Sequence, residues 1–221
     1  MLVAANYAAL VAQTTAAYTV SAQVGPIETP LAPDWARFLL DRLDLAASIA
    51  RARRIAPYEI TRTAPGTYLA DDHDGTKAVL AVVEAGERSR VFYAEGTQKF
   101  RMLPSVRAAA VILMSQEPVD QPGCPGHVRT TFTVYARLRS RLLGAVVKAL
   151  RPLLRDAIAR KFSRAFLVAH KVGLLLAEDP APVAAELLRS PLLSPPERAA
   201  AERLAASLKP QPRACLAPVK P

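Results

Sequence analysis

An α+β fold is predicted, in which antiparallel strands precede a long amphipathic helix. Three observations predict it. Residues 58–138 alternate apolar and polar side chains in short runs. Turn residues separate these runs at short intervals, which is typical of an antiparallel meander. Apolar residues then recur at helical spacing over residues 142–177.

The first predicted helix begins at Pro33 and continues to the basic residues near Arg54. Pro33 and Asp34 favour a helix start, and Pro57 ends the helix. Basic residues in its last turns suit the negative end of the helix dipole. Its apolar side chains recur at helical spacing, at Trp35, Phe38, Leu39, Leu43, Ala46 and Ile49.

Six strands are predicted after this helix, at residues 58–63, 67–70, 76–84, 88–99, 106–115 and 127–138. Asp74 and Gly75 form a tight corner before the third strand. Residues 117–126 are rich in Pro and Gly and predict a loop. The last strand has one apolar and one polar face. This alternation excludes a parallel sheet that is buried on both faces.

Helical spacing characterises the rest of the chain. Pro152 predicts a kink or the start of a second helix. One apolar stripe follows, at Leu154, Ile158, Phe162, Ala165, Ala169, Val172 and Leu176. A shorter helix follows Asp179, and Ser194 with Glu197 predicts a capping box at the start of another.

Four segments are therefore expected along the chain. Residues 1–32 are an N-terminal segment that can include a first strand at residues 17–24. Residues 33–179 form the main domain, and residues 180–208 form a C-terminal helical appendage. Residues 209–221 contain four prolines and predict a disordered tail.

Composition narrows the functional class only in part. The 221 residues are 51% hydrophobic and carry a net charge of +10, from 29 Lys and Arg against 19 Asp and Glu. Such a charge suits a nucleic acid, an anionic membrane surface or simple solubility, and all three readings stay open.

The termini and cysteines indicate a cytoplasmic protein, with a peripheral location on a membrane also open. The apolar residues 1–22 lack the basic start of a secretory signal. No apolar run approaches the roughly 20 residues of a spanning helix. Cys124 and Cys215 belong to no CxxC pair or Cys/His cluster, so nothing demands an oxidising compartment.

The order of these elements resembles the START-like helix-grip superfamily, which includes polyketide cyclase and lipid-transport type domains. The stretches that carry the resemblance are residues 77–84, 88–96, 127–138 and 142–177, within residues 33–179. The resemblance implies a curved antiparallel sheet that grips the long C-terminal helix. It also implies an apolar cavity for a lipid, sterol, isoprenoid or polyketide, without assigning any residue to it.

Inward-facing side chains of the predicted sheet and helix would line such a cavity. The expected ligand-binding residues are Val91, Tyr93, Ile112, Met114, Phe132, Val134, Leu154, Ile158 and Phe162. The alternative is that these side chains pack on one another as an ordinary core. Both readings stay open, because ligand pockets are themselves mostly apolar.

A basic segment precedes and surrounds Pro152. Its residues Arg141, Lys148, Arg151 and Arg155 are interleaved with apolar side chains, which predicts a membrane-docking helix. Each basic residue close to an anionic membrane contributes about 1 kcal/mol of binding. The alternative is a solvated helix face.

The sequence contains no recognisable catalytic motif. His73 lies among Asp71, Asp72 and Asp74, but the spacing matches no known metal site, so an acidic turn is expected, with no metal and no cofactor. The leading hypothesis is binding and transfer of a hydrophobic small molecule, without catalysis. A cyclase-like enzyme that uses Tyr93, Glu95 or His127 is one alternative. Nucleic-acid binding through the basic surface is the other, and the oligomeric state is open.

Overall fold

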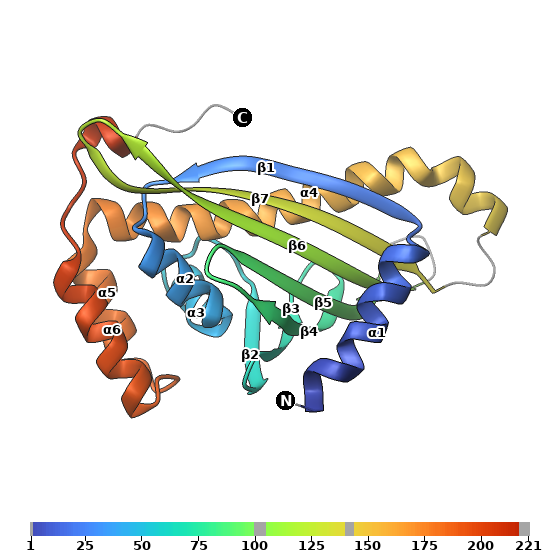
Figure 1. The fold of residues 1–221 in the computed structure, drawn as a ribbon, viewed down its shortest axis with the longest axis horizontal. Helices are drawn as coiled ribbons and strands as arrows, with labels where there is room; N and C mark the ends of the chain where they lie inside the picture. Colours follow the sequence, from blue (N-terminus) through green and yellow to red (C-terminus); the bar gives the residue numbers. More distant parts are fainter. Residues whose placement is uncertain (1, 100–104, 140–143, 217–221) are drawn as a thin grey trace. The chain divides into compact units, whose positions relative to one another are not determined.

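The structure, a computed structural model, describes residues 2–99, 105–139 and 144–216. Figure 1 shows its elements in chain order. The helices are α1 Leu2–Ala16, α2 Pro33–Asp41, α3 Leu43–Ala52, α4 Gly144–Glu178, α5 Pro180–Leu188 and α6 Pro195–Ser207. The strands are β1 Val20–Thr29, β2 Glu59–Ala64, β3 Thr67–Asp71, β4 Thr76–Ala85, β5 Ser89–Gln98, β6 Val106–Gln121 and β7 Cys124–Leu138.

Seven strands form one sheet in the order β1-β7-β6-β5-β4-β3-β2. The pairs from β2 to β6 are antiparallel, because short turns connect successive strands. The predicted fold class is confirmed. The chain is α+β, with an antiparallel sheet followed by a long C-terminal helix, which is the layout of the helix-grip fold.

The chain divides into two compact units that are interleaved along the sequence. The first unit contains Met1–Gly25, Tyr58–Ser115 and Thr131–Ala165. The second unit contains Pro26–Pro57, Gln116–Thr130 and Phe166–Pro221. The strands β1, β6 and β7 and the helix α4 each contribute residues to both units.

In the first unit, α1 covers one face of the central strands. Tyr93, Ala109 and Val111 are buried there, and side chains of α1 pack against them. The rings of Tyr7 and Tyr93 lie 5.6 Å apart between centroids. The helix at residues 2–16 was not predicted from the sequence. The candidate first strand at residues 17–24 begins at Val20 instead.

The core of the second unit joins α2 and α3 to the C-terminal helices. Its buried residues include Trp35, Leu45, Leu176 and Leu187. The indole nitrogen of Trp35 donates a hydrogen bond of 3.1 Å to the carbonyl of Leu204. Burying each such large apolar side chain stabilises the fold by about 1.5–3 kcal/mol.

The single helix predicted from Pro33 is two helices, α2 and α3. Arg42 lies between them with φ −135° and ψ 62°, outside the helical region. Its guanidinium is buried and donates to both carboxylate oxygens of Asp44, at 3.0 and 2.9 Å, and to the carbonyl of Leu192 at 2.6 Å. These partners hold Arg42 inside the protein, and the chain bends there although its apolar spacing continues.

The loop predicted over residues 117–126 is mostly strand. β6 continues to Gln121 and β7 begins at Cys124, so only Pro122 and Gly123 form the turn. Gly123 adopts a φ of 76°, which a glycine tolerates without strain. Pro and Gly therefore marked a tight turn here, rather than a long loop.

The structure shows no second helix that starts at Pro152. α4 runs without interruption from Gly144 to Glu178, about 50 Å at 1.5 Å per residue. Its buried stripe also differs from the expected one. Ala165 and Ala169 are exposed, and Phe166 is buried instead, because its large side chain gains more from leaving water.

The predicted C-terminal elements α5 and α6 are present, and the capping box forms as expected. The carboxylate of Glu197 accepts hydrogen bonds from the backbone nitrogen of Ser194 at 2.9 Å and from its hydroxyl at 2.6 Å. Within the expected tail, Arg213–Leu216 form a 3-10 helix. Over the described ranges, no helix has an apolar stretch long enough to cross a lipid bilayer.

Candidate functional site

The two faces of the sheet in the first unit differ in what covers them. Residues directly opposite each other on paired strands share a face. Ala81, Tyr93 and Val111 are cross-strand partners on the face that α1 covers. Phe92 and Ile112 are partners on the other face, which we call the inner face.

Most of the inner face is apolar over three neighbouring strands, with the buried Arg90 opposite Met114. Phe92, Ile112 and Met114 are buried there. Around them lie six smaller or partly accessible apolar residues, Ala78, Leu80, Val82, Ala94, Ala108 and Ala110, and all six are half-buried. A contiguous apolar surface on this face therefore keeps part of its area accessible to solvent.

Gly96 belongs to the same face and lets two strands approach closely. A Cβ atom at this position would collide with the backbone carbonyl of Lys77 and with Ala78. The glycine therefore permits the close approach of β4 at Ala78, its cross-strand partner, and it lies opposite Ala108 of β6.

The structure does not bring the predicted ligand-binding residues onto one face. Val91 and Tyr93 lie on the face that α1 covers, whereas Ile112 and Met114 lie on the inner face. On β7, Tyr135 packs with the α1 cluster. Because side chains alternate along a strand, Phe132 and Val134 point to the inner face.

The helix residues of the same prediction lie on α4. The side chains of Ile158 and Phe162 are half-buried in the first unit. Leu154 belongs to α4, but its side chain lies outside the described part of the structure. Of the predicted residues, Ile112, Met114, Phe132 and Val134 thus lie on the inner face. Phe92, which was not predicted from the sequence, lies there too.

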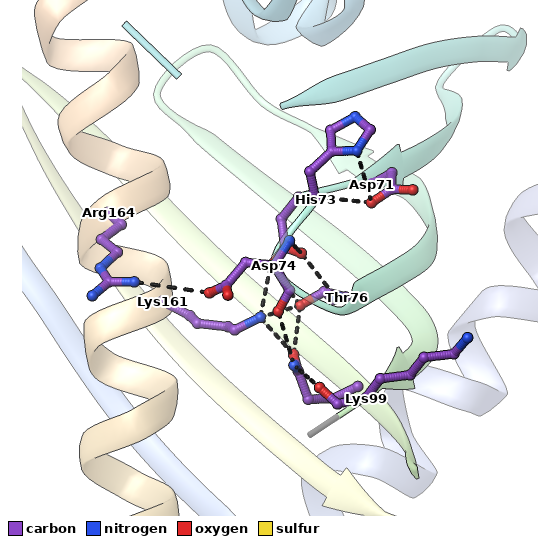
Figure 2. A network of polar contacts seen from close by, with 9 residues as sticks. Asp71, His73, Asp74, Thr76, Lys99, Lys161 and Arg164 are labelled. Carbon is purple, nitrogen blue, oxygen red and sulfur yellow. Dashed lines mark hydrogen bonds and ion pairs between the residues drawn. The ribbon is translucent and has the colours of Figure 1, made fainter. Parts of the chain in front are cut away.

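A polar cluster ties α4 to one end of the inner face. Figure 2 shows Lys161 extending from α4 toward the turn between β3 and β4. Its ammonium group lies 2.6 Å from the carboxylate of Asp72 and 2.5 Å from the side-chain oxygen of Gln98, and it also donates to the hydroxyl of Thr76. Thr76 and Gln98 are cross-strand partners on the inner face. This contact therefore places α4 on that face.

The three donors of the Lys161 ammonium group are all used by these oxygen atoms. Arg164, one turn further along α4, lies 3.9 Å from the carboxylate of Asp74 and is exposed. The cluster fixes the helix position through hydrogen bonds, since its donors already have protein partners.

The acidic turn that precedes Thr76 is satisfied by its own backbone. Asp71 accepts from the backbone nitrogen of His73 at 2.8 Å, and Asp72 accepts from the backbone nitrogens of Asp74 and Thr76, each at 2.8 Å. His73 adopts a φ of 52°, as turn residues of this type often do. In residues 2–99, 105–139 and 144–216, no group of three or more His, Cys, Asp or Glu is arranged to hold a metal ion.

The pKa values of Asp72 and Tyr58 are shifted at this turn. Burial raises the pKa of Asp72, but hydrogen bonds from Lys161 and from Thr76 outweigh it, so the pKa lies below its ordinary value of 3.8. The pKa of Tyr58 is raised, first by burial and then by the negative charge of Asp72. Asp72 is thus the carboxylate that the cluster holds ionised.

The hydroxyl of Tyr93 has protein partners. Its hydroxyl donates to Glu95 at 3.3 Å, and Arg139 reaches both Glu95 at 2.7 Å and the Tyr93 hydroxyl at 3.4 Å. Burial and then the charge of Glu95 raise the pKa of Tyr93. Of the three candidate groups for a cyclase-like enzyme, Tyr93 and Glu95 therefore form a hydrogen bond with each other. The ring of His127 lies next to the carbonyl groups of Cys124 and Cys215.

The predicted membrane-docking residues are described only in part. Arg141 lies outside the described residues, and Lys148 and Arg151 lie on α4 with side chains that are not described. Arg155 is exposed on α4. The prediction stays open for this segment.

A disulfide joins Cys124 to Cys215, 91 residues apart, in the second unit. His127 lies beside it, with Nδ1 3.2 Å from the carbonyl of Cys124 and Nε2 3.2 Å from the carbonyl of Cys215. No spacing signal in the sequence indicated this pairing, because the two cysteines meet only after the C-terminal helices fold back.

Comparison with known proteins gives structural likeness alone. No family model and no curated protein matches this chain. Among solved structures, a conserved protein from Geobacillus kaustophilus is 17% identical, with a TM-score of 0.48 over 68% of this chain and 93% of that chain. Ara h 8.0201 is 12% identical, with a TM-score of 0.39 over 70% of this chain and 95% of that chain. At these identities neither structure assigns a function to this chain.

Proposed function

We propose that this chain binds a hydrophobic small molecule, such as a lipid, a sterol or an isoprenoid, on the inner face of the sheet. The observation that carries the proposal is the contiguous half-buried apolar surface around Phe92 and Ile112, which lies on the same face as α4. Soluble proteins rarely leave a contiguous apolar surface accessible to water unless a ligand or a partner binds there.

The chemistry of the face favours a ligand that is bound by burial. Each square ångström of apolar surface removed from water contributes about 25 cal/mol. Arg90 and Lys161 are cations at this face, and both have protein partners. The buried Arg90 donates to the carbonyls of Gly86 and Ser89. Lys161 of α4 donates to three protein oxygens. An anionic head group would have to displace Asp72 from this ammonium, so an uncharged ligand is expected.

Two adjacent residues of β4 give a matched test. Leu80 lies half-buried on the inner face, and Val79 lies on the opposite face with 41% of its surface exposed. Leu80→Asp places a charge on the proposed binding surface and Val79→Asp places the same charge outside it. We expect Leu80→Asp to weaken binding of the fluorescent probe N-phenyl-1-naphthylamine at least tenfold, with Val79→Asp close to wild type.

Circular dichroism and thermal unfolding would establish that both variants are folded. Equal probe affinity for the two variants would refute the inner face as the binding surface. A second measurement is independent of any substitution. Organic extraction of the purified protein, followed by mass spectrometry, should yield one discrete apolar compound, and a trace of mixed lipids would contradict the proposal.

We further propose that α4 docks the protein on an anionic membrane, where an apolar ligand could be transferred. Arg155 is exposed on α4, and Arg141, Lys148 and Arg151 precede it along the chain. Replacing Lys148, Arg151 and Arg155 by Glu should abolish sedimentation with phosphatidylserine vesicles at low salt. Arg51→Glu, at an exposed position on α3, is the control and should sediment as wild type does.

A further inference from the structure

The disulfide fastens a short segment near the C-terminus, residues 209–216. The Cα atoms of Cys124 and Cys215 lie 5.4 Å apart, within the usual range for a disulfide. Cys124 begins β7, and Cys215 belongs to the 3-10 helix Arg213–Leu216. Both cysteines are buried, although the residues just before Cys215 are exposed.

His127 links the same two residues without a covalent bond. Its ring is 4% exposed and lies between the carbonyl groups of Cys124 and Cys215, 3.2 Å from each oxygen. A carbonyl oxygen only accepts hydrogen bonds, so the ring nitrogen that carries a hydrogen donates to one of them. The histidine thus lies where it can hold the two cysteine backbones next to each other.

Backbone hydrogen bonds also attach the segment. The backbone nitrogen of Gln211 donates to the carbonyl of Ala177 at 2.8 Å, and that of Cys215 donates locally to Pro212 at 2.8 Å. Pro210 and Pro212 limit regular hydrogen bonding there. The disulfide adds a covalent attachment of this segment to the start of β7.

We propose that Cys124 and Cys215 form a thiol–disulfide latch for residues 209–216, and that His127 is the positioning residue that brings the two sulfur atoms together. The latch closes by exchange with a disulfide-form oxidant such as oxidised glutathione. One cysteine thiolate attacks a sulfur of the oxidant, which releases one glutathione and leaves a mixed disulfide. The second cysteine thiolate attacks the protein sulfur of that mixed disulfide and releases the second glutathione.

The exchange is balanced in atoms and electrons. The two cysteine thiols lose two electrons and two protons in total, and the oxidant gains them as two glutathione thiols. The state of the segment then depends on the surroundings. It is latched where thiols are oxidised and released where they are kept reduced. An oxidised native protein would therefore point to an oxidising compartment, in contrast to the cytoplasm expected from the sequence.

Trypsin cleavage after Arg213 tests the latch. Arg213 is exposed next to the buried Cys215. We expect the oxidised protein to be cleaved there at least tenfold more slowly than the protein reduced with a phosphine. Release of the peptide 214–221 would be measured by mass spectrometry after quenching and full reduction of each sample.

The double variant Cys124→Ser/Cys215→Ser is the control and should be cleaved at the fast rate with or without reductant. Equal rates for oxidised and reduced wild type would overturn the latch. Two alkylated thiols remaining after the reduced wild type has been treated with excess oxidised glutathione would overturn it as well.

The rate of latch closure tests the role of His127. After reduction, oxidised glutathione is added and the mixed disulfide is followed by acid trapping and intact mass. We expect the wild type to resolve the mixed disulfide without accumulating it, and His127→Gln to resolve it at least tenfold more slowly. His170→Gln replaces another histidine of the second unit, which contacts Thr29, and should behave as wild type does.

A further measurement uses the wild type alone, so it remains valid if the His127 variant fails to fold. The wild type should resolve the mixed disulfide at least tenfold faster in buffer than in 6 M urea. Equal rates in the two solvents, or an unchanged rate in folded His127→Gln, would reject the positioning role of His127.

Discussion

Arg42 shows most clearly how one residue organises the second unit. Its side chain is 4% exposed, its carboxylate partner Asp44 is 2% exposed, and Glu197 of α6 lies 2.8 Å from its guanidinium. A buried ion pair of this kind is costly to form but far more costly to break on one side. The residue therefore joins α2, α3 and α6 through charge as well as through packing.

Arg42→Met should destabilise the protein by about 3–5 kcal/mol, because it leaves Asp44 charged and unpaired in the interior. Urea unfolding at neutral pH measures the change. Arg42→Met combined with Asp44→Asn should recover much of the loss. Arg37→Met is the control, since Arg37 forms an exposed pair with Asp34 and should change stability by less than about 1 kcal/mol. A loss as small as that for Arg42→Met would contradict the buried-pair account.

Asp72 makes the stability of the first unit depend on acid. Its pKa in the folded protein lies below the ordinary 3.8, since hydrogen bonds from Lys161 and Thr76 outweigh the effect of burial. The unfolded chain therefore takes up this proton at a higher pH than the folded chain does. The stabilisation is complete above the ordinary pKa and is lost as pH falls toward the depressed value.

Asp72→Asn should flatten this acid dependence, which is measured from urea unfolding between pH 2.5 and pH 6. Lys161→Met should bring the pKa of Asp72 closer to its ordinary value, so the loss of stability in acid is smaller than in wild type and ends at a higher pH. A Lys161→Met profile that overlays the wild type would show that Lys161 does not hold Asp72 ionised.

Side-chain alternation in the sequence predicts which residues of one strand share a face. It does not predict the register between neighbouring strands. Val91 and Tyr93 share a face, as do Ile112 and Met114, and both pairs follow from simple alternation. The register between β5 and β6 decides whether these two pairs lie on the same face of the sheet. A shift of one residue exchanges the two faces, so the register decides which residues can line a site.

Among the elements, α6 was the most predictable because its start depends on local hydrogen bonds. Ser194 and Glu197 are three residues apart, and this spacing lets each side chain reach the backbone of the other. Such a signal acts within one turn and needs no tertiary contact.

Ser194→Ala should destabilise the second unit by about 1 kcal/mol, since an exposed helix start loses its capping hydroxyl. Thermal unfolding measures the change. Ser207→Ala, at the other end of α6, is the matched control and should have a smaller effect. Equal effects would show that the cap contributes nothing specific.

Helix boundaries were predicted incorrectly where contacts between residues far apart in the sequence outweigh local helix propensity. The chain bends at Arg42 although helical spacing continues through it. α4 passes Pro152 without a break although proline weakens a helix by about 3 kcal/mol. In a helix of this length, the hydrogen bonds on both sides of the proline maintain the helical path.

At the level of the whole chain, the Cys124–Cys215 bond closes a loop of 91 residues that contains most of β7 and all of α4, α5 and α6. A closed loop restricts the unfolded chain, and the restriction grows with loop length. The disulfide therefore links the start of β7 to the C-terminal segment independently of side-chain packing.

Cys124→Ser/Cys215→Ser should lower the free energy of unfolding by about 3–5 kcal/mol relative to the oxidised protein. Calorimetry of oxidised wild type, reduced wild type and the double variant measures it, and the last two should agree. A double variant as stable as the oxidised protein would show that the bond adds no stability.

The antiparallel α+β layout, the long helix α4 and the capped start of α6 follow from the sequence, because periodicity and capping act between residues that are close along the chain. The inner face, the Lys161 cluster and the disulfide beside His127 depend on residues far apart in sequence. Lys161 and Thr76 are 85 positions apart, and Cys124 and Cys215 are 91 apart. Strand register and the return of the C-terminal helices bring such residues together, and no local pattern encodes either of them.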